Sequence, residues 1–459
     1  MMKALLIDFG STYTKVALVS MEPPGLIAVS QAPTTVESDL MEGLEAALAS
    51  FTGRQLRGVT FKRASSSAAG GLRLVAVGLV PELTVKAARE AALGAGARVL
   101  AAYAYTLSGT EIAEIGALKP DLLLLAGGTD GGNREVILEN ASRIAASALE
   151  MPVVVAGNKS AADEAAAILK GKVPRVEVTG NVMPGVDRLN VEPAREAIRG
   201  LYLSEITRAK GLDRVQQRVG LVMPTPLAVM KAGELYWKAT GRETMIIDLG
   251  GATTDVHSFA DGRPRDAGRI VKGPPEPPVK RTVEGDLGMR VSLSALLGVI
   301  PTGELAESLP FTLDEGALPA YARRASLSRD FLPGDEKERA LDGAIAGAAI
   351  REALRRHAGS LTETYTPQGR LWVQQGKDLT ATAAVIATGG ALVHGRDPGA
   401  LLRAGLSLGD PLVLSPRSPQ IFLDRAYILA SAGLLGETRP EAALAVLKDT
   451  LQPLGGISG

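Results

Sequence analysis

The chain has 459 residues, more than one ordinary core holds, which predicts two domains of roughly 200 residues each. Basic and acidic residues balance at 50 each, so the net charge gives no global attraction to nucleic acid or to an anionic membrane. The absence of cysteine excludes thiolate catalysis, cysteine-ligated zinc, iron–sulfur clusters and disulfides. Because no apolar run suggests a signal peptide or a membrane span, we expect a cytoplasmic protein without nucleic-acid or membrane partners.

The first part of the chain alternates strand and helix patterns. Residues 3–20 form two apolar strands around a tight polar turn, and residues 26–32 continue as a third strand. From residue 120 to residue 210, apolar strands alternate with helical patterns, which indicates a parallel sheet with helical crossovers. We therefore expect an α/β fold with a first domain at residues 1–242. An inserted α/β segment is expected at about residues 133–240.

The second part of the chain begins with a new hairpin pattern near Glu243. A helix is expected at residues 337–357, followed by an apolar strand that ends at Gly390. These patterns predict a second domain at residues 243–420. A last apolar helix within residues 421–459 is expected to pack back on the first domain.

A repeated segment carries the strongest signal in the sequence. "LLIDFGSTYTK" at residues 5–15 and "MIIDLGGATTD" at residues 245–255 are each an apolar strand that ends in Asp, an apolar residue and Gly. Aligned on Asp8 and Asp248, the two segments also share a threonine at the seventh position. The repeat predicts two similar halves that face each other and grip one nucleotide phosphate chain.

The first segment has the residue types that a phosphate-binding turn requires. Small residues let a polyphosphate approach the backbone N–H groups, hydroxyls donate hydrogen bonds, and a carboxylate holds magnesium through its waters. An ordinary hairpin with a polar turn is the alternative for one such segment. Asp8 is the candidate carboxylate, and the candidate phosphate-binding residues are Gly10, Ser11, Thr12, Tyr13, Thr14 and Lys15.

The second segment and a later glycine pair extend this prediction. Asp248 and Asp255, with Asp8, are candidate magnesium ligands, and Asp8 and Asp248 are also candidates for polarising an attacking water. After the strand within "IATGGALVH", a double glycine would let a flat adenine lie against the backbone. The further candidate nucleotide-binding residues are Gly250, Gly251, Ala252, Thr253, Gly389 and Gly390.

Two other motifs need separate interpretations. "AGGTDGG" at residues 126–132 follows an apolar strand, so it is a candidate phosphate loop or hinge, and its Asp130 is a candidate catalytic residue that orients water. "DVHSFA" at residues 255–260 imitates the start of a corrinoid-binding pattern but has alanine where that pattern has glycine. We therefore interpret His257 as a sheet residue and not as a cobalt ligand.

The three nucleotide motifs, in this order, resemble the superfamily of actin, sugar kinases and heat-shock chaperone ATPases. "DLGGATTDV" in particular is similar to the second phosphate loop of the chaperone branch. The resemblance implies two RNase-H-like domains with ATP and magnesium in the cleft between them. It also implies that Gly389 and Gly390 adjoin the adenosine. By the same likeness, the residues that contact phosphate or magnesium are Asp8, Gly10, Ser11, Thr12, Lys15, Asp248, Gly250, Gly251, Thr253 and Asp255.

Longer segments resemble the MutL family associated with glutamate mutase, which shares only its name with the mismatch-repair protein. They include "KPDLLLLAGGTDGGN" at residues 119–133, "MPTPLAVMKAGELY" from Met223 and "RTVEGDLGMR" at residues 281–290. This resemblance implies a slow ATPase that acts as a reactivating factor for an adenosylcobalamin-dependent mutase. Two alternatives remain, a small-molecule kinase with Asp130 as its base and an actin-like filament protein, and the neutral charge permits self-association.

Overall fold

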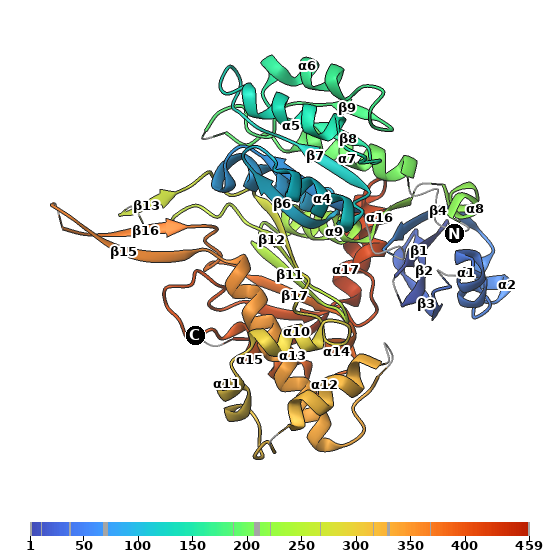
Figure 1. Ribbon diagram of the computed structural model, residues 1–459. Coiled ribbons are helices and arrows are strands. Elements are labelled where there is room, and N and C mark those ends of the chain that lie inside the picture. The colour runs from blue at the N-terminus through green and yellow to red at the C-terminus, as the bar shows by residue number, and fades with distance from the viewer. Residues whose placement is uncertain are drawn as a thin grey trace. The chain divides into compact units, whose positions relative to one another are not determined.

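The chain divides into two compact units (Figure 1). Unit 1 comprises Met1–Val19, Ile27–Val229 and Gly273–Pro277, and unit 2 comprises Ser20–Leu26, Met230–Lys272 and Pro278–Gly459. The computed structural model describes residues 2–10, 12–35, 38–67, 72–186, 188–205, 212–220, 222–266, 268–314, 316–327, 331–367 and 369–457.

The first sheet of unit 1 has the strand order β10-β4-β1-β2-β3. Leu5, Ile7 and Phe9 of β1 alternate along the strand and enter one core, so Asp8 lies on the opposite face. That core also receives helices α1 and α8. The elements are β1 (Lys3–Phe9), β2 (Tyr13–Met21), β3 (Pro24–Pro33), α1 (Leu40–Leu48), α2 (Gly53–Leu56), β4 (Val59–Ser66), α8 (Leu212–Val219) and β10 (Val222–Pro224).

The second sheet of unit 1, which we call the inserted sheet, is fully parallel and has the order β6-β5-β7-β8-β9. Helices α3 and α7 cover one of its faces, and α4, α5 and α6 cover the other. The elements are β5 (Arg73–Gly78), a π-helical turn (Pro81–Val85), α3 (Lys86–Gly94), β6 (Arg98–Ala104), α4 (Gly109–Leu118), β7 (Leu122–Leu125), α5 (Glu135–Ala145), β8 (Val153–Val155), α6 (Lys159–Leu169), β9 (Val176–Val178) and α7 (Glu192–Glu205). The insertion thus begins near Arg73, earlier than the expected residue 133.

The main sheet of unit 2 has the order β14-β12-β11-β17-β18-β19. Helices α13 and α15 pack on one of its faces, and α9 packs on the other, where Gly233 lies against Phe259 and Ile246. The elements are α9 (Thr225–Thr240), β11 (Thr244–Leu249), β12 (Thr254–Phe259), β14 (Val279–Glu284), α10 (Leu293–Val299), α11 (Thr302–Glu307), α12 (Ala317–Leu327), α13 (Glu336–His357), β17 (Ala384–Thr388), α14 (Gly390–Val393), α15 (Pro398–Leu406), β18 (Gln420–Leu423), α16 (Leu429–Gly436), α17 (Pro440–Thr450) and β19 (Gln452–Gly456).

A second, smaller sheet of unit 2 forms a long arm (Figure 1). It consists of β13 (Arg269–Lys272), β15 (Ser360–Thr366) and β16 (Gly369–Gln375), in the order β13-β16-β15. Trp372 lies in this arm and Trp237 lies in α9, so both tryptophans of the chain belong to unit 2.

The main sheets of the two units share one strand order. The spatial orders β3-β2-β1-β4-β10 and β14-β12-β11-β17-β18 match strand for strand, and in both the last three strands are parallel to one another. The prediction of two similar α/β domains is therefore confirmed. The division between the units falls within α9 instead of at residue 242, and α16 and α17 belong to unit 2 instead of the first domain. Among the described residues, no helix combines the length and the apolarity that a bilayer span requires.

Candidate functional site

The first hairpin, residues 8–15, turns so tightly that glycine is required at position 10. The amide of Gly10 donates to the carbonyl oxygen of Tyr13 at 3.0 Å. A Cβ atom at Gly10 would lie 2.8 Å from the same oxygen, closer than real Cβ contacts allow. Ser11, predicted to bind phosphate, lies outside the described residues.

Asp8 is held at the carboxyl end of β1 by two hydroxyl groups. Ser65 Oγ donates to Asp8 Oδ1 at 2.8 Å, and Thr225 Oγ1 donates to the same atom at 2.5 Å. Ser65 is the register partner of Asp8 in β4, and Thr225 is the first residue of α9 directly after β10. Asp8 Oδ2 receives no hydrogen bond from a described residue, so this carboxylate is oriented with one oxygen available. The sequence did not predict that either hydroxyl residue contacts Asp8, although "SSS" and "MPTP" stand at these strand ends.

The other predicted residues of the first hairpin differ in burial, because side chains alternate between the two faces of β2. Thr12, Tyr13 and Lys15 are half-buried at or beside the turn. Thr14 is fully buried, and its hydroxyl oxygen lies 3.1 Å from that of Thr34. The buried hydroxyl of Thr14 thus has a structural contact, and its role in phosphate binding stays a prediction.

The second hairpin, residues 248–255, repeats the same turn. The amide of Gly250 donates to the carbonyl oxygen of Thr253 at 2.9 Å, and a Cβ atom at Gly250 would lie 2.9 Å from that oxygen. Gly251 and Ala252 at the tip are exposed, and a Cβ atom at Gly251 would meet only Arg290, at 3.7 Å or more. The two hairpins thus agree in backbone geometry as well as in sequence.

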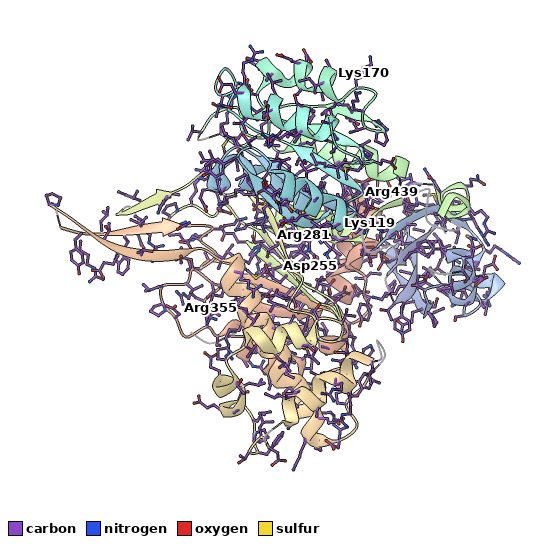
Figure 2. The ribbon with its side chains drawn as sticks, viewed as in Figure 1. Lys119, Lys170, Asp255, Arg281, Arg355 and Arg439 are labelled. Carbon is purple, nitrogen blue, oxygen red and sulfur yellow. The ribbon has the colours of Figure 1, made fainter. Side chains whose placement is uncertain are left out.

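Asp255 is occupied by an ion pair (Figure 2). Arg281, from β14, donates to Asp255 Oδ1 through Nε at 2.9 Å and through Nη2 at 2.5 Å. Thr253 Oγ1 donates to Asp255 Oδ2 at 3.0 Å. Since both carboxylate oxygens accept these hydrogen bonds, Asp255 supports the hairpin, and its role as a magnesium ligand stays a prediction.

The loop at residues 285–292 packs against the second hairpin and supports it. Met289 and Arg290 donate their amides to the carbonyl oxygens of Gly250 and Gly251 at 3.1 and 2.8 Å. Gly288 lies so close that a Cβ atom there would be 2.3 Å from the carbonyl carbon of Ala252. The side chain of Arg290 is buried in an ion pair with Asp342 at 2.9 Å. The sequence did not predict this contact with the second hairpin, although the loop contains the motif "GDLGMR".

Asp248 lies half-buried at the end of β11, beside Asp255 of β12 and Thr388 of β17 in the sheet register. Tyr427, which precedes α16, has a left-handed backbone with φ of 52°. Burial raises the pKa of Tyr427 above its usual value, and the negative charges of Asp248 and Asp424 raise it further. Asp424 itself is buried and accepts hydrogen bonds from the first amides of α16.

The two glycines after β17, Gly389 and Gly390, differ in how closely other atoms approach them. Gly389 has φ of 108°, and a Cβ atom there would lie 2.2 Å from the carbonyl oxygen of Leu249. Gly390 is exposed, and a Cβ atom there would meet nothing within 4 Å. Gly389 is therefore required for packing against β11, while Gly390 leaves backbone accessible to a ligand.

Asp130 does not lie in the sheet that carries Asp8. It follows β7 of the inserted sheet, and its Oδ1 accepts hydrogen bonds from Asn181 Nδ2 at 2.9 Å and from the amide of Lys159 at 3.1 Å. Burial alone would raise the pKa of Asp130, but these donors and the charges of Lys159 and Arg188 outweigh it and hold the pKa below its usual value. These contacts give Asp130 a bracing role in its own loop.

The histidines form no metal site among the described residues. His257 is a buried residue of β12, as the sequence predicts, and burial lowers its pKa to about 3. Within the described part of the chain, no three or more histidine, aspartate or glutamate side chains gather as a metal would require. A magnesium ion here would need water and phosphate oxygens as further ligands.

Comparison with known proteins identifies the family. Residues 4–451 match the family described as MutL protein. Protein MutL of Clostridium tetanomorphum is 45% identical over 459 residues, which covers 97% of this chain and 98% of the relative. The chain belongs to the MutL family.

Solved structures similar to this MutL-family chain share little sequence with it. Nucleotide-free acetone carboxylase has a TM-score of 0.40 and 14% identity, over 94% of this chain and 69% of that chain. Nucleotide-free diol dehydratase-reactivating factor has a TM-score of 0.36 and 13% identity, over 96% of this chain and 100% of that chain. The activator of 2-hydroxyisocaproyl-CoA dehydratase from Clostridium difficile with bound ADPNP has a TM-score of 0.32 and 10% identity, over 100% of both chains. Because these scores are low, the fold assignment depends on the matched strand order of the two main sheets.

Proposed function

We propose that the chain binds ATP with magnesium and uses the first and second hairpins as its two phosphate-binding elements. The observation that carries this proposal is the duplicated turn. Gly10 and Gly250 make the same hydrogen bond, to Tyr13 and Thr253 respectively, and a carboxylate stands two residues before each glycine. A polar turn that arises by chance has no reason to occur twice, at the same place in two matching sheets.

The residues present fit this ligand. Asp8 Oδ2 receives no hydrogen bond from a described residue, and Asp248 stands at the matching strand end, so both carboxylates can hold the waters of a magnesium ion. The missing side chains of Gly10, Gly250 and Gly251 let phosphate oxygens approach backbone amides, and the open backbone of Gly390 suits the adenosine. Bound magnesium neutralises phosphate charge and polarises the attacking water.

We propose further that slow ATP hydrolysis drives a conformational change that acts on a partner enzyme. The support is membership of the MutL family and the sequence resemblance to the branch associated with glutamate mutase. On this basis the partner is an adenosylcobalamin-dependent mutase, and the reaction outcome is its reactivation. Purifying the chain with such a mutase, with and without ATP, tests the partner directly, and an association that never responds to ATP contradicts it.

Asparagine variants of the three candidate aspartates test the nucleotide site. Asp8→Asn and Asp248→Asn remove one charge each with little change of shape, so ATP hydrolysis is expected to fall about 100-fold in each. Asp130→Asn is the matched control and should keep hydrolysis within about twofold of wild type. Unchanged hydrolysis in both hairpin variants would contradict the proposal. Loss in Asp130→Asn, with a phosphorylated small molecule as product, would favour the kinase alternative.

A further inference from the structure

The inserted sheet has a topological switch point between β5 and β7. Numbered along the chain, its strands lie in the order 2-1-3-4-5, and all of them are parallel. From β5 the chain leaves for α3 on one face, and from the neighbouring β7 it leaves for α5 on the other face. In open α/β sheets, ligands bind outside the carboxyl ends of such a strand pair. The two loops at this place are residues 78–85 and the glycine loop, residues 126–133.

Buried side chains hold both loops in one conformation. Thr84 Oγ1 accepts hydrogen bonds from the amides of Leu79 and Val80 at 2.8 and 3.0 Å. Asn158, fully buried, accepts from the amide of Gly131 and donates to the carbonyl oxygens of Gly132 and Asn133, each at 3.1 Å. Loops fixed in this way are preorganised, which is what a binding site requires.

The glycine loop approaches its neighbours so closely that side chains are excluded. Gly127 and Gly128 have φ of 144° and 70°, and a Cβ atom at Gly128 would lie 2.2 Å from the carbonyl oxygen of Asn133. At the end of β8, a Cβ atom at Gly157 would lie 2.8 Å from the carbonyl oxygen of Gly127. The loop is therefore built from glycine for its shape, not for chain flexibility.

Three consecutive amides of the glycine loop have no hydrogen-bond acceptor among the described residues, those of Gly127, Gly128 and Thr129. The flanking amides are paired, since Ala126 donates to Val77 and Asp130 donates to Pro184. Gly127 and Gly128 are buried, and buried N–H groups without an acceptor are rare in folded proteins. Successive N–H groups in a glycine-rich turn are a typical binding element for an anion.

We propose that the glycine loop binds the phosphate group of a small phosphate monoester, at a site distinct from the two hairpins. The amides of residues 127–129 donate to the phosphate oxygens, and the hydroxyl of Thr129 adds a further donor. Tyr105 supplies a flat surface for the organic part of the ligand. It is 59% exposed, has φ of 64°, and its amide is fixed to the carbonyl oxygen of Leu79 at the switch point.

The nearby charges agree with this assignment. Asp130 is the acidic residue within the loop, and its Oδ1 already accepts from Asn181 and from the amide of Lys159. The side chains of Lys159 and Arg188 are exposed and lie near enough to Asp130 to lower its pKa. The phosphate therefore meets the amides and the Thr129 hydroxyl, while Lys159 and Arg188 offset the negative charge of the neighbouring Asp130, which favours an anion over a neutral or cationic group.

Peptide-resolved hydrogen exchange of the full chain tests the proposal, with inorganic phosphate and flavin mononucleotide as probes. We expect exchange of residues 126–134 to slow about tenfold with flavin mononucleotide and to respond less to phosphate. Riboflavin, which lacks the phosphate, should leave these residues unchanged. The same protection is expected in Asp8→Asn, so this result is independent of the proposed ATP site.

Two variants and one control locate the site. Gly128→Ala is expected to abolish protection because its Cβ would collide with Asn133. Since that change can also disrupt the inserted sheet, Thr129→Val is the second variant, with an expected tenfold loss of affinity at an unchanged melting temperature. Gly171→Ala is the control, because Gly171 has a similar φ of 75° with no atom within 4 Å. Protection confined to residues 10–15 and 248–255, or protection that survives in both Gly128→Ala and Thr129→Val, would overturn the proposal.

Discussion

The first and second hairpins have the same turn but are supported in different ways. Asp8 is held by two neutral hydroxyls, from Ser65 and Thr225. The second hairpin is held by charges, through the pairs Arg281–Asp255 and Arg290–Asp342. Neutral donors orient a carboxylate without cancelling its charge, whereas an arginine neutralises it. The aspartate and the glycine turn are thus the same in both hairpins, whereas the side chains that hold the hairpins in place differ.

Removing the arginine of the second hairpin is expected to have the largest effect on stability. Arg281→Met leaves Asp255 with a mostly buried, unpaired charge, which costs about 3–5 kcal/mol of unfolding free energy. Chemical denaturation measures this loss. The double variant Arg281→Met, Asp255→Leu removes both charges and should recover most of it. A single variant as stable as wild type would contradict the ionic support.

The paired glycines test whether the two turns are equivalent. Gly10→Ala and Gly250→Ala each place a Cβ within 3 Å of a carbonyl oxygen, so each should destabilise the chain by about 1–3 kcal/mol. Gly251→Ala is the control and should be nearly neutral, since its Cβ has only ordinary contacts. Thermal melts compare the three variants. A large difference between Gly10→Ala and Gly250→Ala would show that the turns are not equivalent.

The neutral support of the first hairpin should contribute less to stability. Ser65→Ala removes one buried hydrogen bond to Asp8 but leaves the one from Thr225, so a loss of about 1 kcal/mol is expected. The same variant should lower ATP hydrolysis, because Asp8 is then less firmly oriented. Denaturation and turnover measured together distinguish this pattern from simple unfolding, in which activity returns fully at low temperature.

Mild acid is expected to weaken unit 2 first, because all three histidines of the chain belong to it. Burial holds the pKa of His357 well below its usual value, and the positive charges of Lys280 and Lys377 and the nearby His257 lower it further. The unfolded chain therefore binds more protons below about pH 6.5, so stability falls as pH decreases from there. His357→Gln should flatten this pH dependence, whereas the same change at the exposed His394 should not. Denaturation midpoints between pH 7 and pH 5 measure it.

The sequence predicted the repeated hairpins and the α/β class well, because both depend on local patterns. It did not predict the partners of Asp8, since Ser65 and Thr225 lie 57 and 217 positions away and hydroxyl residues are common. The burial of Thr14 was not predicted either, because the residue types alone do not show which face of β2 lies inward. The start of the insertion near Arg73 was not predicted, because the sequence does not show which strands β5 and β6 pair with.

The location of Trp237 and Trp372 gives the molecule a natural optical reporter. Both indoles belong to unit 2, so fluorescence excited selectively at tryptophan comes from that half alone. Unfolding of unit 1 by itself would leave this emission largely unchanged. A shift in the emission wavelength on adding inorganic phosphate, which does not absorb this emission, would therefore record a structural change in unit 2 caused by a ligand bound to unit 1.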